Sequence, residues 1–235
     1  MIILSLETST QNFSLAVSED EKILMKRSLH LPKILDSSII PAIDQTLKNL
    51  KLTVSDCDGF AVGLGPGSFT SLRVGLAAVK GLAFATGKSV VGLSSLDILA
   101  MNVFDVSCDE ICVILDAKRN LLYGCLYRKK GESLKRTSEY LLIPLDELLD
   151  RVHGRTLFVG DGVGLYKQDI EKAYAAAARK RKTSCAPFFA PEKFWFPQAS
   201  QLSLLAYGRF LKNEYDDIRT LTPIYLYPTD CQVKK

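Results

Sequence analysis

Near the N-terminus, apolar and polar positions alternate in short segments, which is the pattern of half-buried strands. Residues 1–6, 13–18 and 22–28 each show this alternation, and the polar run 18–21 separates the second segment from the third. We therefore expect three consecutive strands that pair as a β-meander.

After Pro32 the apolar positions recur at helical spacing, and we expect a helix over residues 33–51. Pro41 lies inside this helix and should bend it, because proline removes one backbone hydrogen bond. The apolar positions that share one side of the helix are Leu35, Ile39, Ile43, Leu47 and Leu50.

The remaining chain alternates between strands and helices and shows the same pattern twice. A strand at 58–63, a helix at 68–86 that ends at Gly87, a strand at 90–93 and a helix opened by Ser94 complete the first series. The second series contains strands at 111–116, 121–127, 133–142 and 156–161, with helices at 144–152, 166–182 and 198–211. Both series open with a strand, a carboxylate, a polar turn and a second strand. We therefore predict an α/β fold of two related domains, residues 1–104 and 105–235.

Composition narrows the functional classes only slightly. At 235 residues and 47% hydrophobic, the chain can bury a core, and its net charge of +4 does not by itself indicate a nucleic-acid binder. Neither the six cysteines nor the two histidines form a metal-ligand pattern, so we expect reduced thiols and no metal site. The N-terminus lacks signal-peptide features, and no apolar run reaches the roughly 20 residues of a membrane span. We therefore expect a cytoplasmic protein without a membrane partner.

Glycines gather in the connection between the strand at 58–63 and the helix at 68–86, which reads GLGPGS. Backbone N–H groups at the start of a helix could hold an anion. However, Pro66 has no N–H group, and no lysine follows to neutralise a triphosphate. Tight turning and close packing of the backbone are the favoured alternative.

Two short polar segments that follow strands, 7–10 and 116–119, could position Mg²⁺ and phosphate. Turn and cap formation is the favoured alternative for these residue types. Together with the glycine loop, they make the candidate anion or nucleotide residues Gly65, Gly67, Ser68, Thr8 and Asp116.

The helix at 68–86 has two distinct sides when its positions are placed at about 100° per residue. One side is an apolar core stripe, made of Leu72, Leu76, Val79 and Ala83. The other side of the helix carries only small residues, namely Ser71, Gly75, Ala77, Ala78, Gly81 and Ala85. Another helix, of the same domain or of a partner, could therefore pack unusually close to it. Arg73 lies between the two sides and could pair with a carboxylate or phosphate or be solvated. The basic run 179–182 could be a solvated helix end or an RNA-facing patch.

Several of these segments together resemble the TsaB (YeaZ) family, which takes part in bacterial tRNA threonylcarbamoyladenosine synthesis. The resemblance rests on residues 63–70, 73–77, 80–83 and 91–96, with support from 3–9 and 115–119. It implies an actin-like (ASKHA, ribonuclease H-like) fold of two related βββαβα-type domains. It also implies a scaffold without catalytic residues that dimerises with the catalytic paralogue TsaD, which transfers threonylcarbamoyl to the adenosine next to the anticodon.

The same resemblance implies that a TsaE-like ATPase joins the complex, that tRNA is contacted indirectly through it, and that the isolated chain can form a homodimer. The helices at 33–51 and 68–86 would form the interface, through Ser68, Phe69, Ser71, Arg73, Gly75, Ala78, Leu82, Ile39 and Ile43. Glu7 stands where the family usually has aspartate, and only His30 matches the helix on which TsaD carries paired metal-binding histidines. We therefore expect no metal or cofactor held by this chain itself, with ATP or ADP possible at the subunit boundary. The alternative is a metal-dependent peptidase-like (glycoprotease family) or nucleotide-binding enzyme of the same fold.

Overall fold

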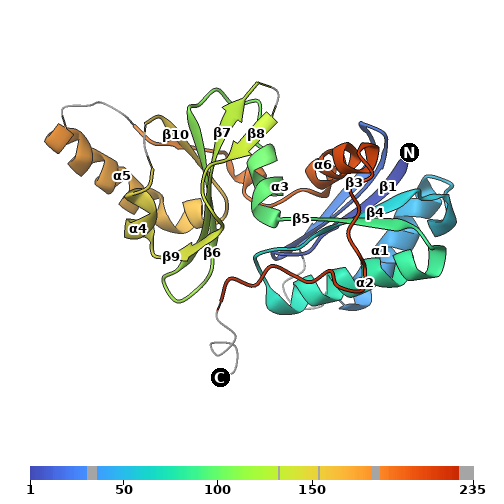
Figure 1. The fold of residues 1–235 in the computed structure, drawn as a ribbon. Coiled ribbons are helices and arrows are strands. Elements are labelled where there is room, and N and C mark those ends of the chain that lie inside the picture. The colour runs from blue at the N-terminus through green and yellow to red at the C-terminus, as the bar shows by residue number, and fades with distance from the viewer. Residues whose placement is uncertain (31–35, 132, 153, 182–185, 228–235) are drawn as a thin grey trace. The chain divides into compact units, whose positions relative to one another are not determined.

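The structure, a computed structural model, describes residues 1–30, 36–131, 133–152, 154–181 and 186–227 (Figure 1). The chain divides into two compact units. The first unit consists of Met1–Ile98 together with Pro197–Tyr225, and the second consists of Leu99–Phe196 together with the chain from Leu226 onward.

The first unit is built on a five-stranded sheet in the order β3-β2-β1-β4-β5. The first three strands pair antiparallel, which confirms the predicted meander, and β4 and β5 continue the sheet in parallel with β1. The strands are β1 (Ile2–Glu7), β2 (Asn12–Glu19), β3 (Lys22–His30), β4 (Gly59–Gly63) and β5 (Ser89–Leu93).

Helices cover both faces of this sheet because side chains along β1 alternate between two cores. Leu4 and Leu6 pack with α1 (Asp36–Asn49) and α2 (Phe69–Thr86), whereas Ile3 packs with α6 (Ala199–Leu211). A short 3₁₀ helix, Val54–Asp56, lies between α1 and β4. Residues 33–35 of the helix predicted at 33–51 lie outside the described residues.

Two predictions about the helices on either side of β5 are confirmed, the end of α2 at Gly87 and the cap at the start of α3. Gly87 ends α2 with a φ of 70°, in the left-handed region that favours glycine. The hydroxyl of Ser94 accepts a hydrogen bond from the Leu96 N–H over 3.2 Å and so caps α3 (Ser95–Met101).

The C-terminal part of the chain departs from the expected division into residues 1–104 and 105–235. Helix α6 and the segment that follows it belong to the first unit, because α6 covers the second face of that unit's sheet. The segment after α6 then protects the edge of the sheet. Asp216 pairs with Val90 across an antiparallel bridge and accepts a hydrogen bond from the Gly92 N–H over 2.8 Å. Arg209 holds the same carboxylate over 3.1 Å.

The second unit contains a sheet in the order β11-β10-β6-β7-β8, with β9 paired to β7. Its strands are β6 (Glu110–Asp116), β7 (Leu122–Lys130), β8 (Ser133–Arg136), β9 (Leu141–Ile143), β10 (Thr156–Val159) and β11 (Phe188–Phe189). Helices α4 (Leu145–Leu149) and α5 (Gly162–Arg181) pack on its core, and a 3₁₀ helix spans Glu192–Phe194.

The single strand predicted at 133–142 is wrong, since two strands, β8 and β9, pair with different parts of β7. The break occurs where the Ser138 hydroxyl accepts a hydrogen bond from the Leu126 N–H, over 3.0 Å, in place of a strand–strand bond.

Helix α5 begins four residues before the predicted start at 166. The residues of the sequence analysis that lie outside the described part include Pro32, Leu35, His153, Lys182, Cys185 and Cys231. Cys57, Cys108, Cys112 and Cys125 are not joined in disulfides. None of the helices in the described ranges has the length and apolar character needed to cross a membrane.

Candidate functional site

The glycine-rich connection packs directly against the turn that follows β1. A Cβ added at Gly63 would lie 2.0 Å from Glu7 Oε2, and one at Gly67 would lie 2.2 Å from the Ser9 carbonyl oxygen. Farther along, on α2, a Cβ at Gly75 would lie 2.3 Å from Thr8 Oγ1. Real Cβ atoms do not approach so closely, so these three glycines permit close packing within the chain. Close packing is the alternative that the sequence favoured.

The Glu7 carboxylate is enclosed by this packing and is fully buried. The Ser9 N–H donates to Glu7 Oε1 over 2.6 Å, and the Ser95 hydroxyl donates to Oε2 over 2.8 Å. Burial raises the pKa of Glu7 above its ordinary value, and the hydrogen bonds from Ser9 and Ser95 oppose that rise. Glu7 therefore joins three segments of the first unit and presents no oxygen to solvent.

Two N–H groups of the loop that could have held an anion already have partners. The Gly65 N–H donates to Ser95 Oγ over 3.1 Å, and the Ser68 N–H donates to the Ser9 carbonyl over 2.7 Å. The peptide bond between Gly65 and Pro66 is cis. Thr8 is buried, and within the described residues its hydroxyl has no hydrogen-bond partner. Ser68, which immediately precedes the first turn of α2, is exposed.

Asp116, the fifth candidate anion residue, belongs to the second unit, whereas the other four belong to the first. Its carboxylate accepts the Lys118 N–H over 2.8 Å and forms an ion pair with the Lys118 ammonium, which raises the pKa of Lys118. Its own N–H donates to Asp161 Oδ1 over 2.9 Å. Burial raises the pKa of Asp161, and the nearby Asp116 charge adds to the rise. Asp161 follows strand β10 as Asp116 ends β6, but it was not among the candidate site residues of the sequence analysis.

The core stripe predicted for α2 is confirmed, but three predicted interface residues lie in the core. Leu72, Leu76, Val79 and Ala83 are buried as expected. Gly75 is buried with them, against Thr8, so its small size serves the unit's own packing. Ile39 and Ile43 of α1 are 1% and 2% exposed because they point into the sheet, and they cannot contact a partner.

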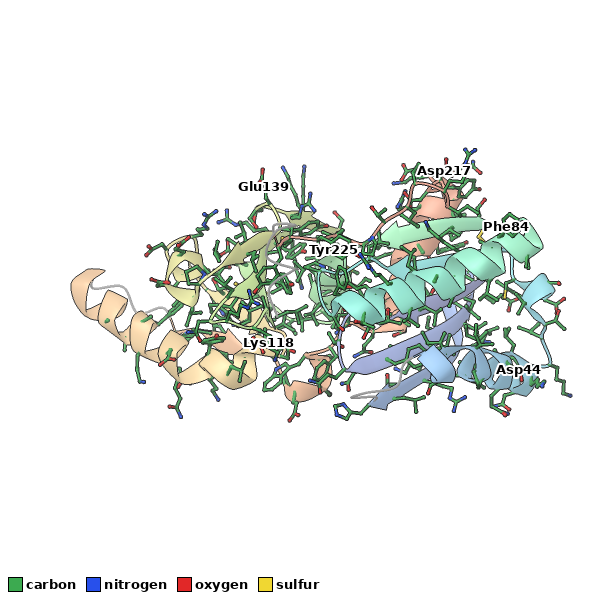
Figure 2. The ribbon with its side chains drawn as sticks, turned by 90° about the horizontal axis from the view of Figure 1, so that it is seen from below. Asp44, Phe84, Lys118, Glu139, Asp217 and Tyr225 are labelled. Atoms are coloured by element: carbon green, nitrogen blue, oxygen red, sulfur yellow. The ribbon has the colours of Figure 1, made fainter. Side chains whose placement is uncertain are left out.

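An outward apolar surface remains on α1 and α2, and we call it the α1/α2 face. Its prominent members are Phe84, which is 84% exposed and labelled in Figure 2, and Ile40, which is 52% exposed. The small exposed residues of α2 are Ala77, Gly81 and Ala85, while Ala78 and Leu82 are half-buried at the margin of the core. The sequence analysis missed Phe84 and Ile40, although both stand one position after a core residue and therefore on another side of the helix.

The N-terminal end of α2 contacts the unit's own C-terminal segment. Arg73 Nε donates to the Tyr225 hydroxyl over 2.9 Å, and the guanidinium lies 3.7 Å from the centre of the Phe69 ring. The rings of Phe69 and Tyr225 lie 5.2 Å apart. Arg73 therefore has an aromatic and hydroxyl environment, which neither of its two predicted roles included. Ser68 and Ser71, also expected at the interface, bond to each other through their hydroxyls over 2.9 Å.

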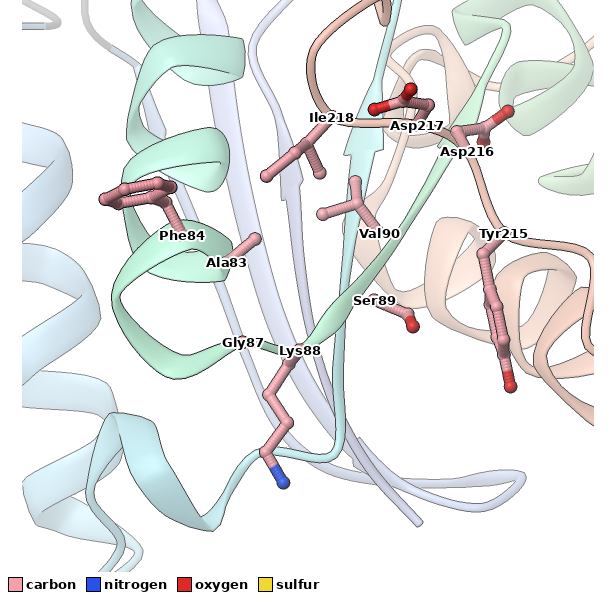
Figure 3. Close-up of a pocket in the computed structure, with 10 residues that line it drawn as sticks. All are labelled: Ala83, Phe84, Gly87, Lys88, Ser89, Val90, Tyr215, Asp216, Asp217 and Ile218. Carbon is pink, nitrogen blue, oxygen red and sulfur yellow. The ribbon is translucent and has the colours of Figure 1, made fainter.

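A hollow of about 350 Å³ lies at the other end of α2 (Figure 3). Its walls are residues 83–84 and 87–90, from the end of α2 into β5, and residues 215–218 of the C-terminal segment. Its two acids are engaged within the chain, since Asp216 holds Arg209 and Asp217 holds Arg219. The Arg219 guanidinium lowers the pKa of Asp217 to about 2.

Comparison with known proteins gives matches over nearly the whole chain. A family model described as TsaD: tRNA N6-adenosine threonylcarbamoyltransferase matches residues 35–229. A protein of Bacillus subtilis (strain 168), named tRNA threonylcarbamoyladenosine biosynthesis protein TsaB, is 27% identical over 239 residues that cover 100% of this chain and 97% of that protein. A tRNA N6-adenosine threonylcarbamoyltransferase of Lawsonia intracellularis (strain PHE/MN1-00) is 32% identical over 111 residues, covering 41% of this chain and 31% of that protein.

Among solved structures, YeaZ from Pseudomonas aeruginosa matches with a TM-score of 0.77 at 22% identity, over 96% of this chain and 99% of that chain. At this identity the match shows that the two chains share a fold.

Proposed function

The chain belongs to the TsaD-type family and, within it, to the TsaB (YeaZ) group of the actin-like superfamily, and from this membership we propose that it is a non-catalytic subunit of tRNA threonylcarbamoyladenosine synthesis. The catalytic step belongs to a TsaD-like paralogue, which transfers threonylcarbamoyl to the adenosine next to the anticodon. The chain binds that paralogue through the α1/α2 face, and a TsaE-like ATPase joins the pair.

One observation carries this proposal, namely that none of the described residues gives a packing reason for glycine at position 81. Glycine inside a helix is about 1 kcal/mol less favourable than alanine. At Gly75 close packing against Thr8 explains the glycine, but a Cβ at Gly81 would meet nothing within 4 Å. A second molecule that lies close to the α2 backbone would account for the small residue at position 81.

The surroundings of Gly81 fit such a contact. Phe84 and Ile40 expose apolar surface on the same pair of helices, and exposed apolar patches commonly mark docking sites. Ala77 and Ala85 are exposed on α2 as well and add little side chain to its surface. In the absence of the paralogue, two copies can cover the same face by two-fold pairing.

The role without catalysis is supported by the state of Glu7. In the proposed scheme this carboxylate is structural, since it is buried and bonded to Ser9 and Ser95. Any ATP or ADP then binds at the boundary with the paralogue. The alternative is a metal-dependent peptidase-like or nucleotide-binding enzyme. A metal-dependent enzyme needs ligands for its metal ion, and the described residues contain no group of three or more His, Cys, Asp or Glu side chains placed to hold one.

The test is association with the TsaD-like paralogue of the same organism, measured as mass in solution. We expect Gly81→Trp and Phe84→Asp to abolish the complex while leaving the thermal unfolding temperature nearly unchanged. Leu165→Asp on α5, at a residue that is 61% exposed, is the matched control and should leave the complex intact. Normal association of both α2 variants would overturn the proposed interface, and threonylcarbamoyl transfer by the chain alone would overturn the non-catalytic role.

A further inference from the structure

The second unit carries a cluster of positive charge on the hairpin of β7 and β8, residues 128–131 and 133–136, which we call the basic hairpin. It reads RKKGESLKR and holds five cations and one acid, in a chain whose net charge is only +4. Arg128, Lys130, Lys135 and Arg136 are exposed, and Lys129 is half-buried.

The strand register places like charges on one face of this hairpin. Arg128 stands directly opposite Lys135, and Lys130 stands opposite Ser133. Side chains directly opposite each other have Cβ atoms about 4.5–5.5 Å apart, and like charges in such a pair are destabilising. Arg128, Lys130 and Lys135 therefore form a positive cluster that the hairpin's own packing does not favour.

The hairpin also extends beyond the sheet that supports it. Strand β6 pairs with β7 only as far as Tyr127, so residues 128–130 are paired with β8 alone. A two-stranded hairpin is only marginally stable by itself. Charge repulsion in such a weakly supported element needs an offsetting interaction.

Protection of sheet edges is one use of this charge. Cations on edge strands prevent unwanted strand pairing, and β8 is the edge strand that carries Lys135. Arg128 and Lys130 lie on the part of β7 that pairs with β8 alone, so they also stand at an open edge. Binding of a polyanion would use the same exposed cations.

Internal partners neutralise some cations of the hairpin and leave others available. Arg128 pairs with the buried Glu110 over 3.3 Å, and Arg136 lies 4.2 Å from the centre of the Tyr140 ring. Lys130 and Lys135 form no ion pair within the described residues. Two exposed lysines without an ion pair to any described residue, next to an arginine that Glu110 only partly neutralises, make a surface suited to a polyanion.

We propose that the basic hairpin binds the phosphate backbone of tRNA. The choice of tRNA as the polyanion rests on the proposed function, whereas the hairpin itself and its charge do not. Lysine contacts phosphate as a point charge and reads no base, so the hairpin adds affinity and position without sequence specificity. This site is separate from the basic run at 179–182, which the sequence alone had suggested as an RNA-facing patch.

The experiment measures binding of unmodified tRNA to the full chain, without the paralogue, at several salt concentrations. Each lost phosphate contact lowers the slope of log affinity against log salt by about 0.7 to 0.9. For Lys130→Gln/Lys135→Gln we expect a slope lower by about 1.4 to 1.8 and, relative to a 1 M salt reference, affinity at 0.1 M salt reduced by about 25- to 60-fold. The Lys130→Arg/Lys135→Arg variant should bind as the parent does.

The matched control is Lys22→Gln/Lys26→Gln, which removes two exposed lysines from the edge strand β3 and should leave the slope unchanged. Absence of tRNA binding by the parent chain, or equal slopes for the parent and the Lys130→Gln/Lys135→Gln variant, would overturn the proposal. So would equally tight binding of polyglutamate, because an acidic protein would then be the better partner. Association with the paralogue is measured separately, so failure of the proposed function and failure of this site give different results.

Discussion

The hydroxyl of Ser95 donates a hydrogen bond to Glu7 Oε2 over 2.8 Å and so ties the start of α3 to the end of β1. Gly63 lies against the same carboxylate, and a Cβ there would come within 2.0 Å of Oε2. The carboxylate thus contacts three segments of the first unit, namely the turn after β1, the start of α3 and the end of β4. It organises the glycine loop, which in turn sets the position of α2 and of the α1/α2 face.

Glu7→Gln should change how stability depends on pH. Burial raises the pKa of Glu7 above its ordinary value of 4.5, so the folded state holds this proton more tightly than the unfolded state does. The unfolded chain then ionises first, and the parent loses stability relative to the Gln variant as pH rises above 4.5. Urea unfolding at pH 5 and pH 8 checks this, with Glu171→Gln, an exposed position on α5, as the control. A difference between parent and Gln variant that is the same at both pH values would contradict the expectation.

Gly63→Ala should destabilise the fold by about 1–3 kcal/mol, because the added methyl group overpacks the site of Glu7. Shortening the neighbour should relieve part of this cost, so the Gly63→Ala/Glu7→Ser double variant should be less destabilised than the sum of the two single variants. A double-mutant cycle from chemical denaturation measures the coupling. Strict additivity would show that the close approach of these two residues is not what makes glycine necessary.

Gly75→Ala and Gly81→Ala should have opposite effects although both replace a glycine inside α2. A Cβ at position 75 meets the Thr8 hydroxyl at 2.3 Å, so the first variant should be less stable than the parent. The second meets nothing within 4 Å and should gain up to about 1 kcal/mol from helix propensity. Thermal and chemical unfolding give both values. Equal effects of the two substitutions would mean that their surroundings do not differ as described.

Tyr225→Phe and Arg73→Lys should each cost less than about 1 kcal/mol, because the hydrogen bond and the cation–aromatic contact that they alter are exposed. Their coupling should be measurable, since Arg73 Nε donates to the Tyr225 hydroxyl over 2.9 Å. The expected coupling energy is about 0.5–1 kcal/mol, determined by a double-mutant cycle of unfolding free energies. The same cycle with Tyr225→Phe and Phe84→Leu, a residue at the other end of α2, should show no coupling.

Local patterns predicted most of the secondary structure because periodicity and cap residues act within a few positions of the chain. The apolar stripe of α2, its end at Gly87 and the cap at Ser94 are all confirmed. The strand at 133–142 failed for a nonlocal reason, since the Ser138 side chain bonds to the backbone of the neighbouring strand β7.

The candidate site was predictable as a region but not residue by residue. A small residue in a helix indicates close approach of something, but it does not say whether that neighbour belongs to the same chain. The fold assigns Gly75 to the inside and leaves Gly81 outside. For the same reason the sequence did not distinguish the buried Ile39 and Ile43 from the exposed Ile40, because adjacent apolar residues on α1 leave the facing side ambiguous until the sheet is in place.

The sequence by itself determined the family, the order of strands and helices, and the importance of the glycine loop and the helix after it, because these depend on local spacing and residue type. Only the tertiary structure decided that Glu7 is enclosed, that α6 covers the first sheet, and that Arg128 stands opposite Lys135. Each of these depends on contacts between positions far apart in the chain, and no local pattern encodes which distant residue will fill a given space.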